Sequence, residues 1–592
     1  MQKLSNKFIK LISEASHLCQ LEKFSEAKVI YEKLLKQIPA NLDVINNLGV
    51  IYANQGNLKL AIKLFDKSLL IKENQPLIFN NLININIDSQ NFDNALNLCN
   101  KNLKFDTNNP TTYFNKARAL FGLENNAEAI NTYKKTLEID PNFYLAHLNM
   151  GFILNKLNKY KEALLQYNKA IKINPQDPII FYNKGIAQGN LLLFEEAIRS
   201  YKIALEIDIS FLPASLNMGK ALEKIGKYKY ALNIYDQAQV IHPKNSEIYL
   251  NRGELNTNLN NYDEAIFDFN KVNEINSNNN KGDYNIALLN LKFKKFENVW
   301  SLYDLRWQTK QAYFNTKKPE LKKLPSTFKK IFIWNEQGIG DQIFFSIIIH
   351  NFAPFFESII IAIDPRMVAL FQRSFRHYEN FKVMPSNDRL NENDYDVQMP
   401  LGSIGRFFIK NKIDISSSVK PFLKSDSNQT KIIKRNLKKE NKIICGLSWK
   451  TKSQENGFNR SIKLDTLMPI LQLNNFIFVN LQYGDSNEEQ NKLEKNYNIK
   501  NYNSIDNFNE LDSFVSLIDA CDVVISIDNS CIHFAGALNK RAYLLLPYAI
   551  GTHWYWGTNQ IKSEWYPSVK IIRQENPNDW ESIIFKLKKD IS

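Results

Sequence analysis

An aspartate follows a glycine-containing turn in the C-terminal half of the chain. Residues 334–343 read WNEQGIGDQI, a strand-like run that passes through Gly338 and Gly340 into a helix beginning near Asp341. A carboxylate in that position can accept a proton from a hydroxyl group as a general base, or it can simply cap the helix. The two glycines could also belong to a dinucleotide-binding fingerprint. That fingerprint has a third glycine, which is missing here, so the match is weak.

A second polar segment lies at residues 525–538, which read ISIDNSCIHFAGAL. An apolar strand ends at Asp528, and Asn529 and Ser530 open a helix. Unpaired amides and the positive dipole end at a helix start bind anions such as a diphosphate, so Asn529 and Ser530 are predicted to hold one and Asp528 to orient them. His533, in the first helical turn, could donate to the diphosphate or steady the leaving group; a packed, structural histidine is the alternative.

Two further segments contribute cations and aromatic rings. Residues 446–450 read GLSWK, and Arg460 follows closely. Lys450 and Arg460 are predicted to neutralise phosphates, although basic residues on α/β loops are often solvated. Trp449 and the tryptophans of the loop HWYW at 553–556 could stack on a base or sugar, or pack in the core.

The same half alternates short β-rich runs with helical ones. Strands are expected at 330–334, 358–363, 442–449, 476–482, 522–528, 542–546 and 569–572. This alternation predicts an α/β region with buried parallel strands, whose ligands bind at the carboxyl ends of the strands. Two lobes, 328–430 and 431–592, are expected after a proline-containing linker at 311–327.

The N-terminal half is repetitive. Alanines recur in steps of 34, at Ala27, Ala61, Ala95, Ala129, Ala163, Ala197, Ala231 and Ala265. Aromatic residues stand three before and four after many of them, and a glycine or alanine stands twelve before. The pattern resembles the tetratricopeptide repeat, a pair of short packed helices. An α-solenoid of about eight repeats and a divergent ninth is expected over residues 1–310.

Asparagines follow the same period, at Asn47, Asn81, Asn115, Asn149, Asn183, Asn217, Asn251 and Asn285. Asparagine is a mediocre helix former, so its use within a helix of every repeat runs against propensity. A structural hydrogen bond is one interpretation. The other is a ladder of exposed carboxamides on the concave face, which could hold the backbone of a threaded polypeptide because an amide both donates and accepts.

The C-terminal motifs resemble the heptosyltransferase-like glycosyltransferases that are fused behind tetratricopeptide repeats. The matching motifs are E-Q-G-x-G-D, S-x-D-x-S-x-x-H-x-A-G-A-L and W-Y-P, within about 328–592. The resemblance implies a GT-B fold of two Rossmann-like lobes with a nucleotide sugar in the cleft. It implies Asp341 as general base, Gly340 among the donor-binding residues, and no metal or further cofactor. The repeats resemble those of O-linked N-acetylglucosamine transferases, in which such a ladder holds protein substrates, and some relatives glycosylate flagellin.

The function expected from these observations is sugar transfer from a nucleotide sugar to a hydroxyl group of a protein, possible acceptors including flagellin. Two alternatives remain. One is transfer to lipopolysaccharide or a small glycan, with the repeats docking partners. The other is a non-catalytic repeat scaffold. The asparagine series favours a protein acceptor.

Composition narrows the remaining classes. The net charge of +14 comes from scattered lysines rather than a basic tail, so nucleic acid is not an expected partner. Five cysteines without a close pair favour a reducing compartment. With no membrane-length apolar run and no signal-peptide pattern, a cytoplasmic location is expected. Asp394 and Asp396 form a D-x-D pair that could suggest a metal, but the resemblance places none there.

Overall fold

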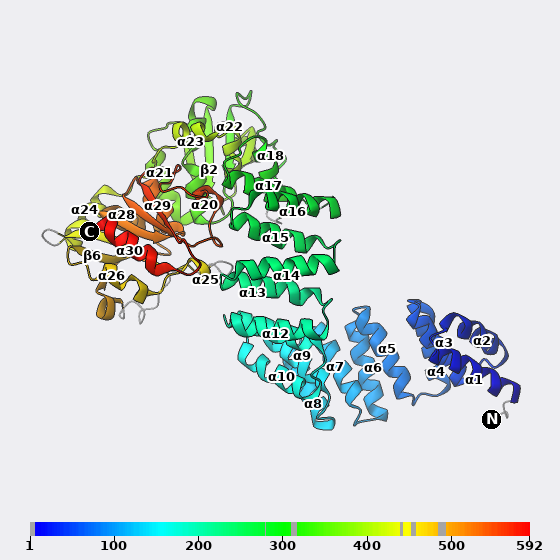
Figure 1. The fold of residues 1–592 in the computed structure, drawn as a ribbon. Coiled ribbons are helices and arrows are strands. Elements are labelled where there is room, and N and C mark those ends of the chain that lie inside the picture. Colours follow the sequence, from blue (N-terminus) through cyan, green and yellow to red (C-terminus); the bar gives the residue numbers. More distant parts are fainter. Residues whose placement is uncertain (1–5, 279, 310–315, 439–441, 452–456, 484–492) are drawn as a thin grey trace. The chain divides into compact units, whose positions relative to one another are not determined.

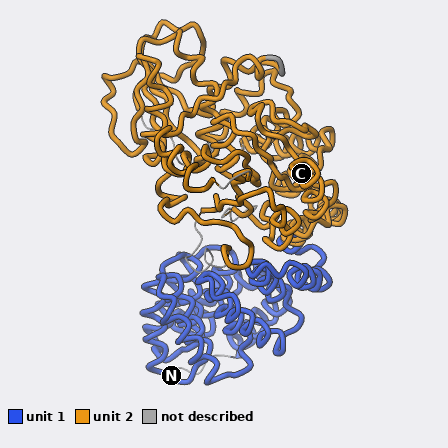
Figure 2. Tube along the Cα trace, turned by 90° about the vertical axis from the view of Figure 1, so that its left-hand side faces the viewer, with its two compact units in different colours: residues 1–214 blue, residues 215–592 orange. Residues whose placement is uncertain are grey.

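The structure is a computed structural model. It describes residues 6–592 except 279, 310–315, 439–441, 452–456 and 484–492. The chain divides into two compact units, residues 1–214 and 215–592 (Figure 1, Figure 2). The second unit contains the α/β region together with the last repeats. Residues 311–315 of the predicted linker 311–327 lie outside the described residues.

The first half of the chain consists of paired helices, as the period of 34 predicts. The pairs are α1 (Asn6–Gln20) and α2 (Phe24–Gln37), α3 (Leu42–Asn54) and α4 (Leu58–Ile71), α5 (Pro76–Asp88) and α6 (Phe92–Phe105), α7 (Pro110–Gly122) and α8 (Asn126–Ile139), α9 (Tyr144–Lys156) and α10 (Tyr160–Ile173), α11 (Pro178–Asn190) and α12 (Phe194–Ile207), α13 (Leu212–Lys224) and α14 (Tyr228–Ile241), and α15 (Ser246–Asn258) and α16 (Tyr262–Ile275). The divergent ninth unit comprises α17 (Lys281–Lys292) and α18 (Val299–Tyr303), followed by α19 (Arg306–Thr309).

The periodic small residues have the packing role expected of them. All eight alanines of the series are fully buried. A Cβ added at Gly151 would lie 2.5 Å from the Tyr167 ring, and Gly185 has the same relation to Tyr201. The aromatic ring four residues after the alanine therefore occupies the space that the glycine leaves.

Two parallel sheets form the α/β region. The first has the order β3-β2-β1-β4 and the second β10-β9-β8-β5-β6-β7. The strands are β1 (Lys330–Trp334), β2 (Ser358–Ile363), β3 (Phe381–Pro385), β4 (Val397–Pro400), β5 (Ile443–Ser448), β6 (Phe476–Asn480), β7 (Ile499–Lys500), β8 (Val523–Ile527), β9 (Ala542–Leu546) and β10 (Val569–Arg573). Both follow the doubly wound order, in which ligands bind where the strand order reverses. Here β1 and β5 occupy that position.

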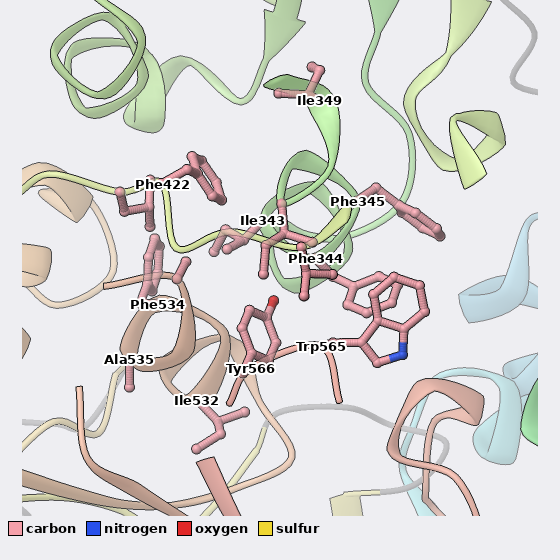
Figure 3. Close-up of a cluster of buried hydrophobic side chains, with 14 of the residues drawn as sticks. Ile343, Phe344, Phe345, Ile349, Phe422, Ile532, Phe534, Ala535, Trp565 and Tyr566 are labelled. Carbon is pink, nitrogen blue, oxygen red and sulfur yellow. The ribbon is translucent and has the colours of Figure 1, made fainter. Parts of the chain in front are cut away.

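Helices accompany both sheets. They are α20 (Ile339–Ser346), α21 (Val368–Phe375), α22 (Gly405–Phe408), α23 (Lys412–Ser418), α24 (Ser427–Leu437), α25 (Gly457–Arg460), α26 (Met468–Leu471), α28 (Leu511–Ala520), α29 (Ser530–Ala537) and α30 (Trp580–Ile591). Helix α20 follows β1, and α29 follows β8. Side chains of α20, including Phe344, pack with Phe534 of α29 and with Trp565 and Tyr566 in one buried cluster (Figure 3). This cluster packs α20 against α29.

The described part of the chain contains no helix that is both long enough and apolar enough to cross a membrane.

Candidate functional site

A cavity of about 400 Å³ lies at the carboxyl ends of the strands, where the starts of α20 and α29 meet. Its lining includes six residues that the sequence had singled out: Gly340, Asp341, Arg460, Asp528, Asn529 and Ser530. His533 lies at its wall as well. The two chemistry-bearing segments, which are almost 190 residues apart in the sequence, therefore share one site.

Asp341 is the third residue of α20, whose N-cap is Gly338, so the helix begins earlier than the sequence suggested. Its Oδ2 accepts a hydrogen bond from the Gly338 amide at 3.3 Å, so it caps the start of α20. It also lines the cavity. Gly340 permits the close approach of α20 to α29, since a Cβ there would lie 3.0 Å from Cδ2 of His533.

Asn529 ties together the strand ends beneath the cavity. Its Oδ1 accepts from the Cys531 amide at 3.0 Å, which caps α29, and its Nδ2 donates to Oγ of Ser448 at 2.8 Å. Ser448 is the last residue of β5, so Asn529 joins the ends of β5 and β8. Ser530, half-buried at the first position of α29, remains at the cavity surface.

Arg460 brings an unusual charge to this site. Its side chain is buried, and no hydrogen bond or ion pair joins it to any described residue; its Nε is an orphan donor. A buried cation without a partner is costly. Arg460 is therefore a candidate source of donors and positive charge for an anion in the cavity.

Asp528 is held by a histidine that sequence reasoning did not assign a role. Its Oδ2 lies 2.8 Å from Nδ1 of His553, and the carboxylate is fully buried. Burial raises the pKa of Asp528, but the charge of His553, its hydrogen bond and the charge of Arg460 together hold that pKa well below its ordinary value. His553 is the first residue of the HWYW loop. The aromatic residues of this loop were the one feature of the sequence that could have pointed to it.

The structure supports the packing alternative for His533. Nδ1 lies 3.0 Å from the Tyr566 hydroxyl, and Nε2 lies 3.3 Å from the Tyr555 hydroxyl. Burial lowers the pKa of His533 to about 3, so the ring is neutral. With both nitrogens engaged by tyrosines, His533 is unsuited to donating to a diphosphate, which corrects that prediction.

The segment after β5 is likewise structural. Trp449 is buried in the core of the second sheet, among the side chains of β5, β6 and β8, and it does not line the cavity. The backbone of Lys450 exchanges two hydrogen bonds with the Gln482 side chain, at 3.0 and 2.9 Å. Within the described residues neither side chain lines the cavity, so their predicted donor contacts are not supported. Trp556 is also buried in the core, whereas Trp554 is half-buried.

Other residues of the cavity were missed. Asp364 and Arg366 follow β2; Arg366 pairs with Asp364 at 2.9 Å and donates to the Phe508 carbonyl at 2.9 Å. The guanidinium lies 4.9 Å from the centre of the Phe508 ring. These contacts connect the segment after β2 to the loop before α28. Their position after a predicted strand was the one available signal.

A second cavity, of about 940 Å³, lies between the last repeats and the α/β region. Its repeat side carries Glu223, Glu254, Tyr284, Asn285 and Lys292, among others. Its other side carries residues that also line the first cavity, namely Gln337, Gly338, Asp341, Arg460, His553 and Tyr555. The two cavities therefore meet at Asp341, and the last asparagine of the series faces the same space.

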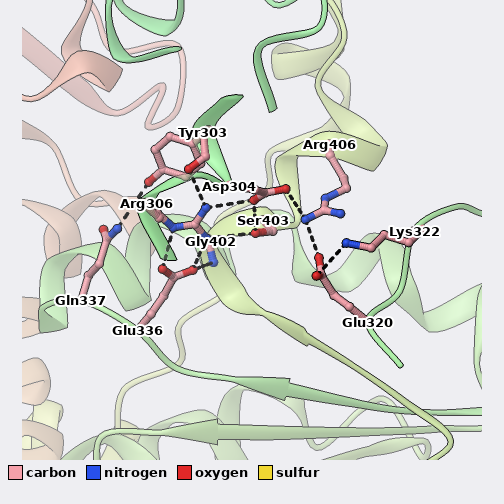
Figure 4. Close-up of polar contacts among 10 residues, drawn as sticks. All are labelled: Tyr303, Asp304, Arg306, Glu320, Lys322, Glu336, Gln337, Gly402, Ser403 and Arg406. Carbon is pink, nitrogen blue, oxygen red and sulfur yellow. Dashed lines mark hydrogen bonds and ion pairs between the residues drawn. The ribbon is translucent and has the colours of Figure 1, made fainter. Parts of the chain in front are cut away.

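The turn before Asp341 is anchored from the end of the repeats. Arg306 is fully buried and donates to both carboxylate oxygens of Glu336, at 2.8 and 2.6 Å (Figure 4). Glu336 also accepts from the Gly402 amide at 2.6 Å. Asp304 accepts from Arg306 and pairs with Arg406, which extends the network. The residues after the ninth repeat are thus part of the structure that positions the site.

The asparagine series is only partly exposed. Asn115, Asn183 and Asn251 are buried, and the other five are half-buried. Exposure of all eight, which a substrate-binding ladder requires, is therefore wrong for three of them. Asn47 donates to the Tyr31 hydroxyl at 3.0 Å and Asn149 to the Tyr133 hydroxyl at 3.1 Å. The structural interpretation applies to these two. A tyrosine sixteen positions earlier is not sufficient for this bond, because within the described residues the Tyr167 hydroxyl, which precedes Asn183, has no partner and the Tyr235 hydroxyl, which precedes Asn251, donates to Glu223.

We expect Asn149→Ala to destabilise its repeat by about 1 kcal/mol, because it leaves the buried Tyr133 hydroxyl without its donor. Asn81→Ala is the matched control. The aromatic residue facing Asn81 is Phe65, which offers no hydroxyl, so the better helix propensity of alanine should leave stability unchanged or raised. Hydrogen exchange of the surrounding helices measures both. Equal losses in the two variants would show that the tyrosine hydrogen bond is not the reason for the asparagine.

No group of three or more potential metal ligands occurs in the described ranges. Oδ2 of Asp396 accepts from the amides of Lys329 and Lys330, at 3.1 and 2.9 Å. The second aspartate of the D-x-D pair thus anchors the start of β1. Metal independence remains a prediction.

Comparison with known proteins identifies the repeats. Models described as TPR repeat or tetratricopeptide repeat match residues 42–74, 110–143, 132–165, 151–191 and 246–279. Residues 42–279 thus contain tetratricopeptide repeats. The chain is 26% identical over 278 residues to Protein FlbA of Caulobacter vibrioides, a match that covers 43% of this chain and 44% of that protein. It therefore spans less than half the length of this relative.

Solved structures are similar over 28% to 47% of the chain. One is MamA of Desulfovibrio magneticus RS-1, with 20% identity, a TM-score of 0.27, and 28% of this chain and 95% of that chain covered. Another is YrrB, described as a TPR protein with an unusual peptide-binding site, with 21% identity, a TM-score of 0.27, and coverages of 31% and 95%. A third is the Cut9–Hcn1 hetero-tetramer of APC/C, with 15% identity, a TM-score of 0.34, and coverages of 47% and 55%.

Proposed function

We propose that the chain transfers a sugar from a nucleotide-sugar donor to a hydroxyl group of a protein acceptor. The observation that carries this proposal is Arg460, a buried guanidinium without a protein partner in the described chain, beside the start of α29. A diphosphate supplies the missing negative charge, and a helix start supplies amide donors. Two doubly wound sheets with this cavity between them are consistent with the GT-B fold that the sequence motifs resemble.

Chemistry then requires a proton acceptor beside the donor. As the acceptor oxygen attacks the anomeric carbon, its proton passes to a base, and the bond from that carbon to the diphosphate oxygen breaks. The electron pair leaves with the nucleoside diphosphate, whose charge Arg460 balances. Asp341 is suited to be the base because it lies where the two cavities meet.

The second cavity favours a polypeptide acceptor over a small glycan. Residues of α15 and α17, including Asn285, form one side of it, and Asp341 lies on the other. An acceptor that reaches Asp341 through this space passes along the last repeats. Polypeptide binding is a common use of such helical-repeat surfaces.

Arg460→Gln tests the donor site. Titrations by calorimetry with UDP-glucose, GDP-mannose and ADP-glucose should show binding of at least one of them to the wild type. The variant should bind it about 10- to 150-fold more weakly, as the loss of a charged hydrogen bond of ~1.5–3 kcal/mol implies. Arg376→Gln, on an exposed position outside both cavities, is the control. Unchanged affinity in Arg460→Gln would remove the main support for the proposal.

A further inference from the structure

We propose that His553, held by Asp528, is a protonated contact for the diphosphate of the donor, so that donor binding weakens as pH rises. This inference rests on the proposed function and adds a second cation to its binding site. The sequence had assigned a role to Asp528 but none to His553.

The geometry gives His553 one free nitrogen at the site. Nδ1 is engaged by Oδ2 of Asp528 at 2.8 Å, and no hydrogen bond joins Nε2 to any residue in the described part of the chain. The side chain is 37% exposed and lines both cavities. Its ring stacks on that of Tyr555, with centroids 5.0 Å apart and planes at 18°, which limits its rotation. Nε2 is thus available to a ligand in the space where Arg460 also lies.

A positive charge on His553 would compensate the carboxylate of Asp528. The Asp528 carboxylate is fully buried, and its Oδ1 has no partner within the described residues. An unpaired buried carboxylate is costly, and within those residues His553 is its only ion-pair partner. As a cation, His553 both neutralises Asp528 and presents an Nε2 proton to a phosphate oxygen. When that proton is lost, Nε2 carries only a lone pair, so it can no longer donate a hydrogen bond to the phosphate oxygen.

Other charged groups line the same space, and the experiment must distinguish their effect on donor affinity from that of His553. They are Asp341, Asp364, Arg366, Arg460, Lys220, Glu223, Lys224, Glu254 and Lys292, and the neutral His533 lines the same space. Two of them titrate in the same range, because burial raises the pKa of Glu223 to about 7 and lowers that of Lys292 to about 7. Lys292 donates to the carbonyls of Thr257 and Asn258. His533, with its pKa of about 3, stays neutral throughout.

The experiment measures nucleotide-sugar affinity from about pH 5.5 to about 8.5, the range in which histidine titrates. UDP-glucose, GDP-mannose and ADP-glucose are suitable probes because their diphosphate diesters do not change charge in this range. For the wild type we expect the Kd to rise about 10-fold or more across the range, the loss of one charged hydrogen bond. His553→Gln should bind weakly and with a flat pH profile. His377→Gln, at an exposed site away from the cavities, and Glu223→Gln should keep the wild-type slope.

A second measurement needs only the wild type. Calorimetry in buffers of different ionisation enthalpy should detect net proton uptake on binding near neutral pH, because the diphosphate stabilises the imidazolium. A wild-type slope that persists in His553→Gln, or a flat wild-type profile without proton uptake, would overturn the inference while leaving the donor site intact. If the wild type binds none of the three probes at any pH, this inference and the proposed donor site both fail.

Discussion

Replacing Asp341 with asparagine should reduce sugar transfer by about 10²- to 10⁴-fold, the usual cost of losing a general base. Asp341 accepts the hydrogen bond of the Gly338 amide from the third position of α20, and the side-chain oxygen of asparagine can accept it as well, so the start of α20 should persist. The variant should therefore fold normally and bind its nucleotide sugar within about threefold of wild type, since RT ln 3 is well below the ~1.4 kcal/mol of a tenfold change.

The measurement is the rate of nucleoside diphosphate release at saturating nucleotide sugar, with the acceptor present. Asp396→Asn is a matched control, because Asp396 also bonds backbone amides at an element start but lies outside both cavities. A wild-type rate in Asp341→Asn would assign Asp341 to helix capping alone.

The repeats were predictable almost to the residue because their signal is periodic and local. Each alanine of the series is fully buried, and the same position recurs in every unit. The strands β1, β2 and β9 agree with their predicted ranges for a similar reason, being buried apolar runs. The strands β3 and β4 were not among those predicted. β3 is only half-buried, and β4 contains the polar Gln398, whose side chain accepts a hydrogen bond from the indole of Trp334 at 2.6 Å. Neither shows the apolar run of a central strand.

The site was predictable in its location but not in the roles of its histidines. A strand that ends in Asp528 and enters α29 is visible in the sequence, and so is the glycine turn before Asp341. Which histidine faces the cavity depends on tertiary packing. His533 is enclosed by Tyr555 and Tyr566, and His553 comes from a loop twenty residues later. No local pattern distinguishes them.

Arg306 illustrates what a repeat period cannot reveal. It lies just after the ninth unit, where the pattern had already faded, and its partner Glu336 was noticed only as part of a motif. Their pairing depends on how the last repeat meets β1. Arg306, on the repeat side of the predicted linker 311–327, therefore belongs structurally with the α/β region that follows it.

Arg306→Met should destabilise the local structure around the site by about 3–5 kcal/mol, which is the usual cost of removing one partner of a buried ion pair. The guanidinium is fully buried, donates to Glu336, Ser403 and Asp304, and lies 4.3 Å from the centre of the Tyr303 ring. Methionine keeps much of the volume but leaves the Glu336 carboxylate buried without its counter-charge. The turn that carries Asp341 should loosen, and sugar transfer should be lost with it.

Hydrogen exchange is the suitable measurement, because a chain with two compact units does not unfold in one step. In Arg306→Met, exchange should accelerate in β1 and at the start of α20, while α1–α12 keep their wild-type protection. Lys329→Met is the control: it removes an exposed ion pair with Glu357 and should change neither region. Adding Glu336→Gln to Arg306→Met should restore part of the protection, because the uncompensated charge is then gone. Protection that is unchanged in the single variant would mean that the Arg306–Glu336 pair does not hold the turn, and that the packing of α20 against α29 suffices to place Asp341.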